Sequence, residues 1–265
     1  MIGAYIVGSP KAIEVRNLSK TFRIPTNSMT TLRERFVQRT RSSYRELRVL
    51  DRISFDVPRG EFLGVTGRNA SGKSTLLKIL AGIYRPDSGT PLAAGRIAPI
   101  IELGVGFNSD LPAYDNVVMN AVMMGLTPAE ARKRYAEIID FAELGDFEHL
   151  KLRNYSSGMR ARLGFAVMTH VDADIMLFDE VLAVGDTRFK EKCAASFERL
   201  KGEGRTGVLV THSMSALVEH CRNAILLEDG KIAARGEPEQ VAEQYKRLQA
   251  KAPKAAARKR SKPRT

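Results

Sequence analysis

The stretch Gly67-Arg68-Asn69-Ala70-Ser71-Gly72-Lys73-Ser74 decides the fold of this 265-residue chain. It matches the pattern Gly-x4-Gly-Lys-Ser, follows the apolar run 62–66 and precedes a helical spacing of leucines. Glycines in such a loop let successive backbone N–H groups point inward at phosphate oxygens. The alternative, a glycine-rich turn that happens to precede a helix, fits poorly because strand, loop and helix are all in register.

The residues of this loop predict a nucleotide-phosphate site with a metal. Lys73 is expected to place its ammonium on the β and γ phosphates, and the Ser74 hydroxyl to ligate Mg²⁺. The residues predicted to bind ATP here are Gly67, Asn69, Ala70, Ser71, Gly72, Lys73, Ser74 and Thr75.

Two carboxylates follow a second apolar strand. Ile175-Met176-Leu177-Phe178 leads into Asp179 and Glu180, and the carboxyl ends of parallel strands lie at the ligand-binding edge of a sheet. Alone, such a pair more often starts a helix. Beside a phosphate loop, Asp179 is expected near Mg²⁺, and Glu180 is expected to polarise the attacking water.

The segment Tyr155-Ser156-Ser157-Gly158-Met159-Arg160 precedes an apolar helix. Serines and glycine at a helix start expose N–H groups at the positive end of the helix dipole, where anions bind. Taken alone, this pattern is more simply an N-cap.

The order of apolar segments predicts an α/β protein. Strands are predicted at 13–15, 53–57, 62–66, 96–101, 174–178, 208–210, 224–227 and 232–234. Helices are predicted after Gly72, at 117–124, 128–141, 157–170 and 187–201, as a short segment between 210 and 224, and from Pro238 onward. Fully apolar strands alternating with helices indicate a mostly parallel sheet covered on both faces, with an antiparallel portion near the start.

The net charge of +12 is concentrated in two places. The tail 251–265 carries seven cations and no acid, and 31–48 carries a net charge of +4, so the rest is near neutral. A nucleic-acid-binding face on the core is therefore not expected. We predict a disordered tail. Between 23 and 49 we expect a basic insertion, either a solvated loop or a short helix on an anionic surface.

The sequence gives no sign of a membrane span or a secretory signal. No run of eighteen apolar residues occurs, and the two cysteines have no metal-ligand spacing. These features predict a cytosolic location.

Taken in order, these motifs and Val210-Thr211-His212-Ser213 resemble the nucleotide-binding domain of ABC transporters over roughly 13–247. The resemblance implies a P-loop ATPase core with an antiparallel β subdomain and a helical subdomain at about 108–170, all within 1–250. It implies a homodimer that traps ATP between the loop of one copy and Ser156, Ser157 and Gly158 of the other. It also implies that His212 contacts the γ-phosphate, Asp186 lies in an interface loop and Phe22 stacks on adenine.

The departures from the usual pattern indicate a branch of that family. The cap reads Tyr-Ser-Ser-Gly-Met rather than Leu-Ser-Gly-Gly-Gln, and Glu102 stands where a metal-contacting glutamine is usual. With 179–193 and the basic insertion, these variants resemble exporters of O-antigen, capsule or teichoic acid. That resemblance implies a separate transmembrane permease docked near 102–116, a lipid-linked polysaccharide as substrate, and a peripheral site on the cytoplasmic face of a bacterial inner membrane.

Three alternatives remain at this level. They are an ATPase that serves a transporter of another substrate, an ATPase of the same superfamily that acts on ribosomes or DNA, and a scaffold that binds ATP only to assemble. Lys73, Asp179, Glu180 and His212 favour catalysis over assembly alone.

Overall fold

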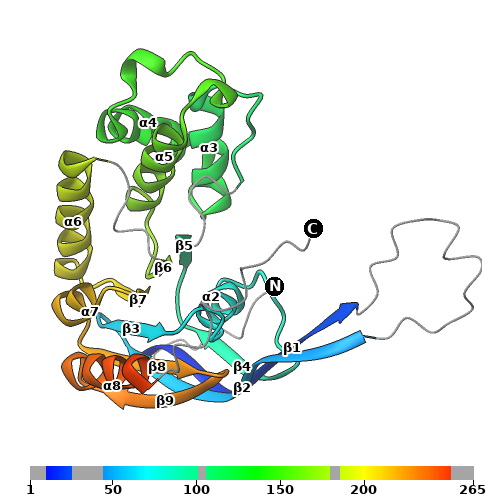
Figure 1. The fold of residues 1–265 in the computed structure, drawn as a ribbon. Coiled ribbons are helices and arrows are strands. Elements are labelled where there is room, and N and C mark those ends of the chain that lie inside the picture. Colours follow the sequence, from blue (N-terminus) through cyan, green and yellow to red (C-terminus); the bar gives the residue numbers. More distant parts are fainter. Residues whose placement is uncertain (1–9, 26–43, 101–105, 180–185, 252–265) are drawn as a thin grey trace, which may run out of the picture.

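The computed structural model describes residues 10–25, 44–100, 106–179 and 186–251. Figure 1 shows a six-stranded sheet in the middle, a three-stranded sheet on one side and the helices α3, α4 and α5 gathered at the opposite end. The phosphate-loop stretch lies between the end of β3 and the start of α2, close to where the two sheets meet.

The larger sheet confirms the predicted, mostly parallel arrangement. Its strand order is β5-β6-β7-β3-β8-β9, and every neighbouring pair is parallel except β8 with β9. Its strands are β3 (Phe62–Gly67), β5 (Ile97–Ile100), β6 (Ile175–Asp179), β7 (Thr206–Val210), β8 (Asn223–Glu228) and β9 (Lys231–Gly236).

The central strands are apolar throughout because both faces of the sheet are buried. In β6, Met176 and Phe178 enter one core, while Ile175 and Leu177 enter the other. Side chains alternate across a strand, so a strand between two cores needs apolar residues at every position. The first core includes residues of α3 to α8, and the second lies between the sheet, α2 and the smaller sheet.

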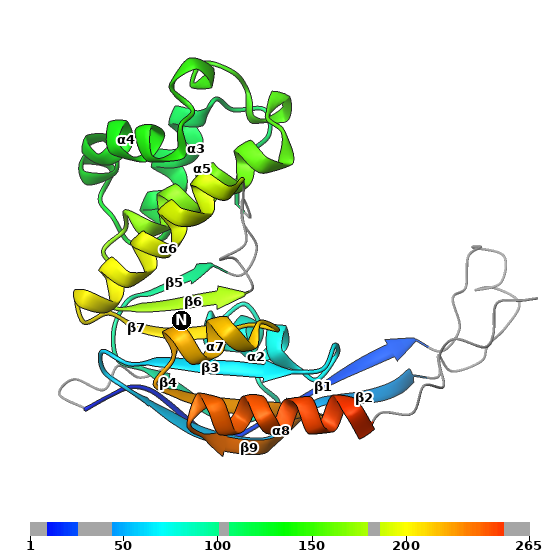
Figure 2. The same cartoon turned by 60° about the vertical axis from the view of Figure 1, so that its left-hand side comes forward.

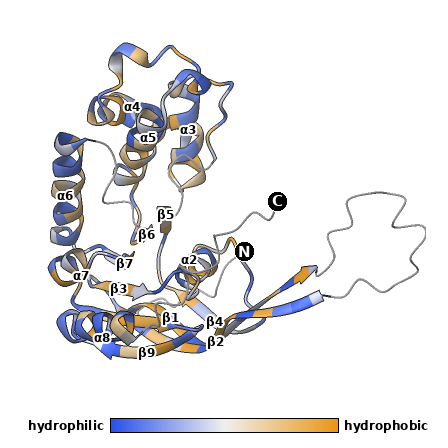
Figure 3. Ribbon diagram, in the orientation of Figure 1, coloured by the Kyte–Doolittle hydropathy of each residue, from blue (hydrophilic) through white to orange (hydrophobic). Residues whose placement is uncertain are grey.

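The smaller sheet is antiparallel, with the order β2-β1-β4. Its strands are β1 (Lys11–Pro25), β2 (Tyr44–Pro58) and β4 (Ser88–Ala93). The predicted strands at 13–15 and 53–57 are therefore only parts of a longer ribbon that projects from the body in Figure 2. In Figure 3 the outer part of β2 is hydrophilic, and such exposed strand residues leave no burial pattern in the sequence.

Two further differences have simple physical reasons. The first part of the expected basic insertion, 23–25, and its last part, 44–49, belong to β1 and β2; 26–43 lies outside the described residues. Strand β4 was not predicted, because Gly89 and Pro91 are both unusual in strands. Pro91 is tolerated because β4 is an edge strand, bonded to β1 alone.

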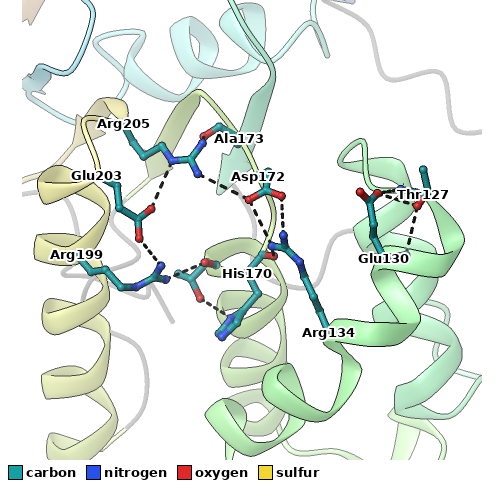
Figure 4. Close-up of polar contacts among 10 residues, drawn as sticks. Thr127, Glu130, Arg134, His170, Asp172, Ala173, Arg199, Glu203 and Arg205 are labelled. Atoms are coloured by element: carbon teal, nitrogen blue, oxygen red, sulfur yellow. Dashed lines mark hydrogen bonds and ion pairs between the residues drawn. The ribbon is translucent and has the colours of Figure 1, made fainter.

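The helices lie close to their predicted positions. They are α2 (Lys73–Leu80), α3 (Ala113–Met123), α4 (Pro128–Ala142), α5 (Ser157–Thr169), α6 (Thr187–Gly202), α7 (Met214–His220) and α8 (Pro238–Lys251), with short 3-10 turns at Gly145–Phe147 and Leu152–Asn154. Helix α4 begins at a capping box: the Thr127 hydroxyl accepts from Glu130 N, and a Glu130 carboxylate oxygen accepts from Thr127 N (Figure 4). Helix α3 begins four residues before its prediction, and buried Asn116 bonds the loop ahead of it.

Three arginines hold the connection between α5 and β6, as Figure 4 shows in part. Arg134 of α4 donates to His170 O, and its Nη2 lies 2.6 Å from Asp172 Oδ2. Arg199 of α6 donates to Thr169 O at 3.1 Å, and Arg205 donates to Ala173 O at 2.8 Å. Guanidinium groups from α4, α6 and the α6–β7 connection thus supply donors to carbonyls at the end of α5 and in the connection that follows.

Within the described ranges, none of the helices has both the length and the apolar character needed to cross a bilayer.

Candidate nucleotide-binding site

Three strand ends bring the predicted site residues to one edge of the large sheet. Strand β7 lies between β3 and β6, and its Val210 pairs with Val65 on one side and Asp179 on the other. The chain then enters the phosphate loop after Gly67 and reaches His212 after β7. In a parallel sheet such carboxyl ends form a shared ligand-binding edge.

The two outer glycines of the loop are required by close backbone approach. A Cβ on Gly67 would lie 2.1 Å from Leu227 O, and one on Gly72 would lie 2.7 Å from Val49 O. Gly72 also has φ 107°, a left-handed conformation that glycine adopts without strain. The loop therefore keeps its curled form because neighbouring strands leave no room for side chains.

Lys73 lies inside the curl. It is 6% exposed, and its ammonium donates to the carbonyls of Gly67 and Arg68, both at 2.9 Å. Nearby Ser71 is buried, and its hydroxyl finds no hydrogen-bond partner among the described residues. Because an unsatisfied buried hydroxyl is costly, this atom marks a position where a ligand oxygen fits.

The loop forms one wall of a hollow of about 980 Å³. Residues 68–71 line it together with His212, Glu228 and Asp229, and Tyr245 and Gln249 of α8 complete the lining. The His212 side chain is exposed to this space, and its Nδ1 lies 3.4 Å from the Tyr245 hydroxyl. Ser74 is exposed in the first turn of α2, next to Lys73.

The Ser156-to-Gly158 segment starts α5 as predicted from its N-cap pattern. The Ser156 hydroxyl accepts from Met159 N at 3.1 Å, and all three residues are exposed. A Cβ on Gly158 would meet only Ser156 Oγ, at 3.8 Å. Nothing in the described part of this chain therefore requires glycine at this position.

Asp186 has its partners within its own chain. It caps α6 by accepting from Phe189 N at 3.0 Å, and its other oxygen accepts from Arg162 of α5. The hydrogen bond from Phe189 N and the Arg162 charge hold the pKa of the Asp186 carboxyl below its usual range. Arg162 in turn bonds Glu143 at 3.2 Å, so it joins the ends of α4 and α6 to α5.

Phe22 lies on the ribbon, half-buried against an aromatic neighbour. Its ring meets Tyr84 edge-to-face with centroids 5.6 Å apart, and the Lys20 ammonium lies 5.4 Å from its centroid. Tyr84 follows the C-terminal end of α2, and Phe22 is not among the described residues that line the hollow.

Two predicted residues, Glu102 and Glu180, lie outside the described residues. Two residues that were not predicted contact predicted site residues in the structure: Arg162 bonds Asp186, and Tyr245 contacts His212. Neither pair is close in sequence, so no local pattern could have found it.

The sheet order, the buried lysine and the curled loop together define an α/β nucleotide-binding protein of the phosphate-loop class. Residues 50–183 match the family model described as "ABC transporter". The chain belongs to the ABC transporter family.

Curated relatives cover most of this chain. The "O-antigen export system ATP-binding protein RfbB" of Myxococcus xanthus is 40% identical over 90% of the chain and 56% of the relative. Its namesake in Klebsiella pneumoniae is 40% identical over 78% of the chain and 84% of the relative. The "Teichoic acids export ATP-binding protein TagH" of Bacillus anthracis is 34% identical over 88% of the chain and 42% of the relative. The chain thus spans little more than half of the Myxococcus relative.

Solved structures share the fold. The ATP-binding cassette MJ0796, in a dimeric post-hydrolysis state bound to ADP and Pi, superimposes with a TM-score of 0.68 at 21% identity over 85% of this chain and 98% of the other.

Proposed function

We propose that this chain is the ATP-hydrolysing subunit of a transporter that exports a lipid-linked surface polysaccharide. The observation that carries the ATPase assignment is the curled loop around buried Lys73 at the edge where Asp179 and His212 emerge. The export assignment rests on the O-antigen and teichoic acid relatives at 34–40% identity.

The proposed roles follow from charge and position. When ATP enters, the Lys73 ammonium exchanges its two carbonyl partners for phosphate oxygens, and the loop N–H groups donate to the same phosphates. The Ser71 hydroxyl gains its missing partner there. Glu180 orients the attacking water, His212 donates to the γ-phosphate, and Phe22 stacks on adenine.

Mg²⁺ suits the oxygen donors at this edge. Where a nucleotide is bound, its phosphate oxygens are common ligands of Mg²⁺. Magnesium is held in that manner, by one or two protein oxygens plus phosphates and water. Ser74 and Asp179 are the proposed protein ligands, with Glu102 as a third, and the ion neutralises charge on the phosphates.

A second copy of the chain completes the site. Gly158 is free of steric demands from its own chain, and the exposed N–H groups at the start of α5 suit an anion. We place Ser156, Ser157 and Gly158 of one copy on the γ-phosphate bound by the other. ATP then joins the two copies, and hydrolysis separates them. Asp186 lies in the interface loop, held there by Arg162.

The remaining partners follow from the relatives' names and the family. The transport path belongs to a separate permease that docks near 102–116, and the chain lies on the cytoplasmic face of a bacterial inner membrane. We take 1–250 as the nucleotide-binding domain, with its helical subdomain at about 108–170, and 251–265 as a basic tail.

Phosphate release by purified chain tests the ATPase assignment. Lys73→Ala should abolish turnover. Glu180→Gln should retain ATP binding, hydrolyse it at less than about one hundredth of the normal rate and elute as a dimer only with ATP. Full activity of Lys73→Ala would remove the loop from the mechanism, and an unchanged monomer with ATP would remove the shared site.

Chromosomal replacement by Glu180→Gln tests the substrate. Loss of surface polysaccharide with lipid-linked polymer accumulating inside is expected. An unchanged envelope, with the purified protein still an active ATPase, would assign the chain to a transporter of another substrate. Salt-sensitive nucleic-acid binding that survives removal of 252–265 would instead favour an ATPase acting on nucleic acid.

A further inference from the structure

Tyr245 reaches the candidate site from the last described helix. It lies on α8, 5% exposed, on the same buried face as Val241 and Ala242. Its ring packs in the core under that helix, and its hydroxyl lies 3.4 Å from His212 Nδ1. A buried tyrosine hydroxyl that finds a polar partner at the wall of a cavity is placed to act on that partner.

The backbone around His212 is already held on both sides. Thr211 N donates to Val65 O at 3.1 Å, and Ser213 N donates to Thr211 Oγ1 at 3.0 Å. The Ser213 hydroxyl then accepts from Ala216 N at 3.2 Å and caps α7. These contacts fix where the side chain starts, and a partner on a ring nitrogen controls the orientation and tautomer of the ring.

We propose that Tyr245 is a positioning residue that sets the tautomer and orientation of His212. Its hydroxyl donates to Nδ1, so the single proton of the neutral ring stays on Nε2, at the other side of the ring. Nε2 then carries the N–H, on a ring that lines the same hollow as the phosphate-loop residues 68–71. This inference rests on the proposed function, in which His212 donates to the γ-phosphate.

The opposite tautomer would serve that function poorly. With the proton on Nδ1, the ring would donate to Tyr245, and Nε2 would present a lone pair to an anionic phosphate. A neutral imidazole has one donor and one acceptor nitrogen, so a donor at Nδ1 selects the donor at Nε2. The hydroxyl of Tyr245 thereby links the last described helix to the reacting end of the nucleotide.

Tyr245→Phe tests this with little disturbance, because it keeps the buried ring and removes only the hydroxyl. We expect kcat for ATP hydrolysis to fall about tenfold while KM changes less than about twofold. The matched control is Tyr135→Phe on α4, which also removes a hydrogen-bonded tyrosine hydroxyl, in this case one 3.1 Å from Glu148 Oε2. This control should leave kcat unchanged. In a His212→Ala background, Tyr245→Phe should have no further effect.

The ¹⁵N shifts of the His212 ring give a readout that needs no turnover. The chain has four histidines, so the His212 signals are assigned by their loss in His212→Ala. The wild type should show the Nε2–H tautomer, and Tyr245→Phe should show a mixture with Nδ1–H. An Nδ1–H tautomer in the wild type would overturn the proposal, as would an equal loss of kcat from Tyr245→Phe with and without His212.

The two levels of the hypothesis fail in different ways. If His212→Ala hydrolyses ATP at the normal rate, the proposed role of His212 is wrong, whatever the tautomer. If His212→Ala is impaired and Tyr245→Phe is not, the role of His212 stands and that of Tyr245 is wrong.

Discussion

Glycines in this chain are present for two different reasons. Gly67 and Gly72 lie where neighbouring backbone excludes a Cβ, so the fold itself requires them. Gly158 faces open space and has no left-handed φ, so the folded chain places no such demand on it. A helix start without a side chain allows close approach by another molecule, as the shared site requires.

Gly158→Ala should therefore affect stability and assembly in opposite directions. Alanine suits a helix better than glycine and should raise the free energy of unfolding by about 0.5–1 kcal/mol. The added methyl group should weaken ATP-dependent dimerisation of Glu180→Gln at least tenfold, as measured by sedimentation. Gly202→Ala at the end of α6, where a Cβ meets nothing within 4 Å, is the control. It should stabilise the chain equally and leave dimerisation unchanged.

At the scale of elements, the important feature is the connection from α5 to β6. Helix α5 carries the Ser156-to-Gly158 segment at its start, and β6 ends at Asp179. The two halves of the proposed site therefore lie at opposite ends of one continuous helix–connection–strand unit. Arg134, Arg199 and Arg205 bond the carbonyls of that connection from outside (Figure 4).

Arg134→Met tests how much this arrangement contributes. It keeps the aliphatic stem but removes the bond to His170 O and the ion pair with Asp172. Both side chains of the pair are about a third exposed, so solvent screening limits the loss to about 1 kcal/mol. Urea denaturation measures this loss, and Arg132→Met, an exposed neighbour on the same helix, is the control. If the two substitutions lowered the free energy of unfolding equally, the contacts of Arg134 with the α5–β6 connection would contribute nothing specific to stability.

At the scale of the whole molecule, paired carboxylates are distributed over several parts of the fold. Hydrogen bonding by Lys20 lowers the pKa of Asp87 on the small sheet, and bonding by Lys192 lowers that of Glu143. Backbone N–H groups at helix starts lower the pKa of Glu130 and of Asp186. The folded chain therefore binds fewer protons than the unfolded chain near these pKa values.

Stability should consequently fall on acidification. Carboxyls with a lowered folded pKa stabilise the chain above their unfolded pKa of about 4, and this contribution is lost as the pH falls through the folded values. The thermal midpoint should decrease steadily between about pH 5 and pH 3, as scanning calorimetry would measure. Glu130→Gln should reduce that dependence. A midpoint that stays constant or rises over this range would contradict the assignment.

An element could be predicted from the sequence where the residues that determine it are neighbours in the chain. The phosphate loop, the Thr127-capped helix α4 and the apolar strand β6 have their causes within a few residues, and all three were predicted. The ends of β1 and β2 were not, because exposed ribbon residues need no apolar pattern. Strand β4 was missed because its proline is tolerated only at a sheet edge, and the sequence does not show which strand is at the edge.

The sequence by itself determined the phosphate loop, the carboxylate pair Asp179-Glu180, the serine–glycine cap and the α/β order of elements, because each is a short-range pattern with its own chemistry. Only the tertiary structure decided that Arg162 bonds Asp186, that three arginines hold one connection and that Tyr245 contacts His212. These pairs are brought together by sheet order and helix packing. Any polar side chain of suitable length could take such a position, so no spacing in the sequence reveals them.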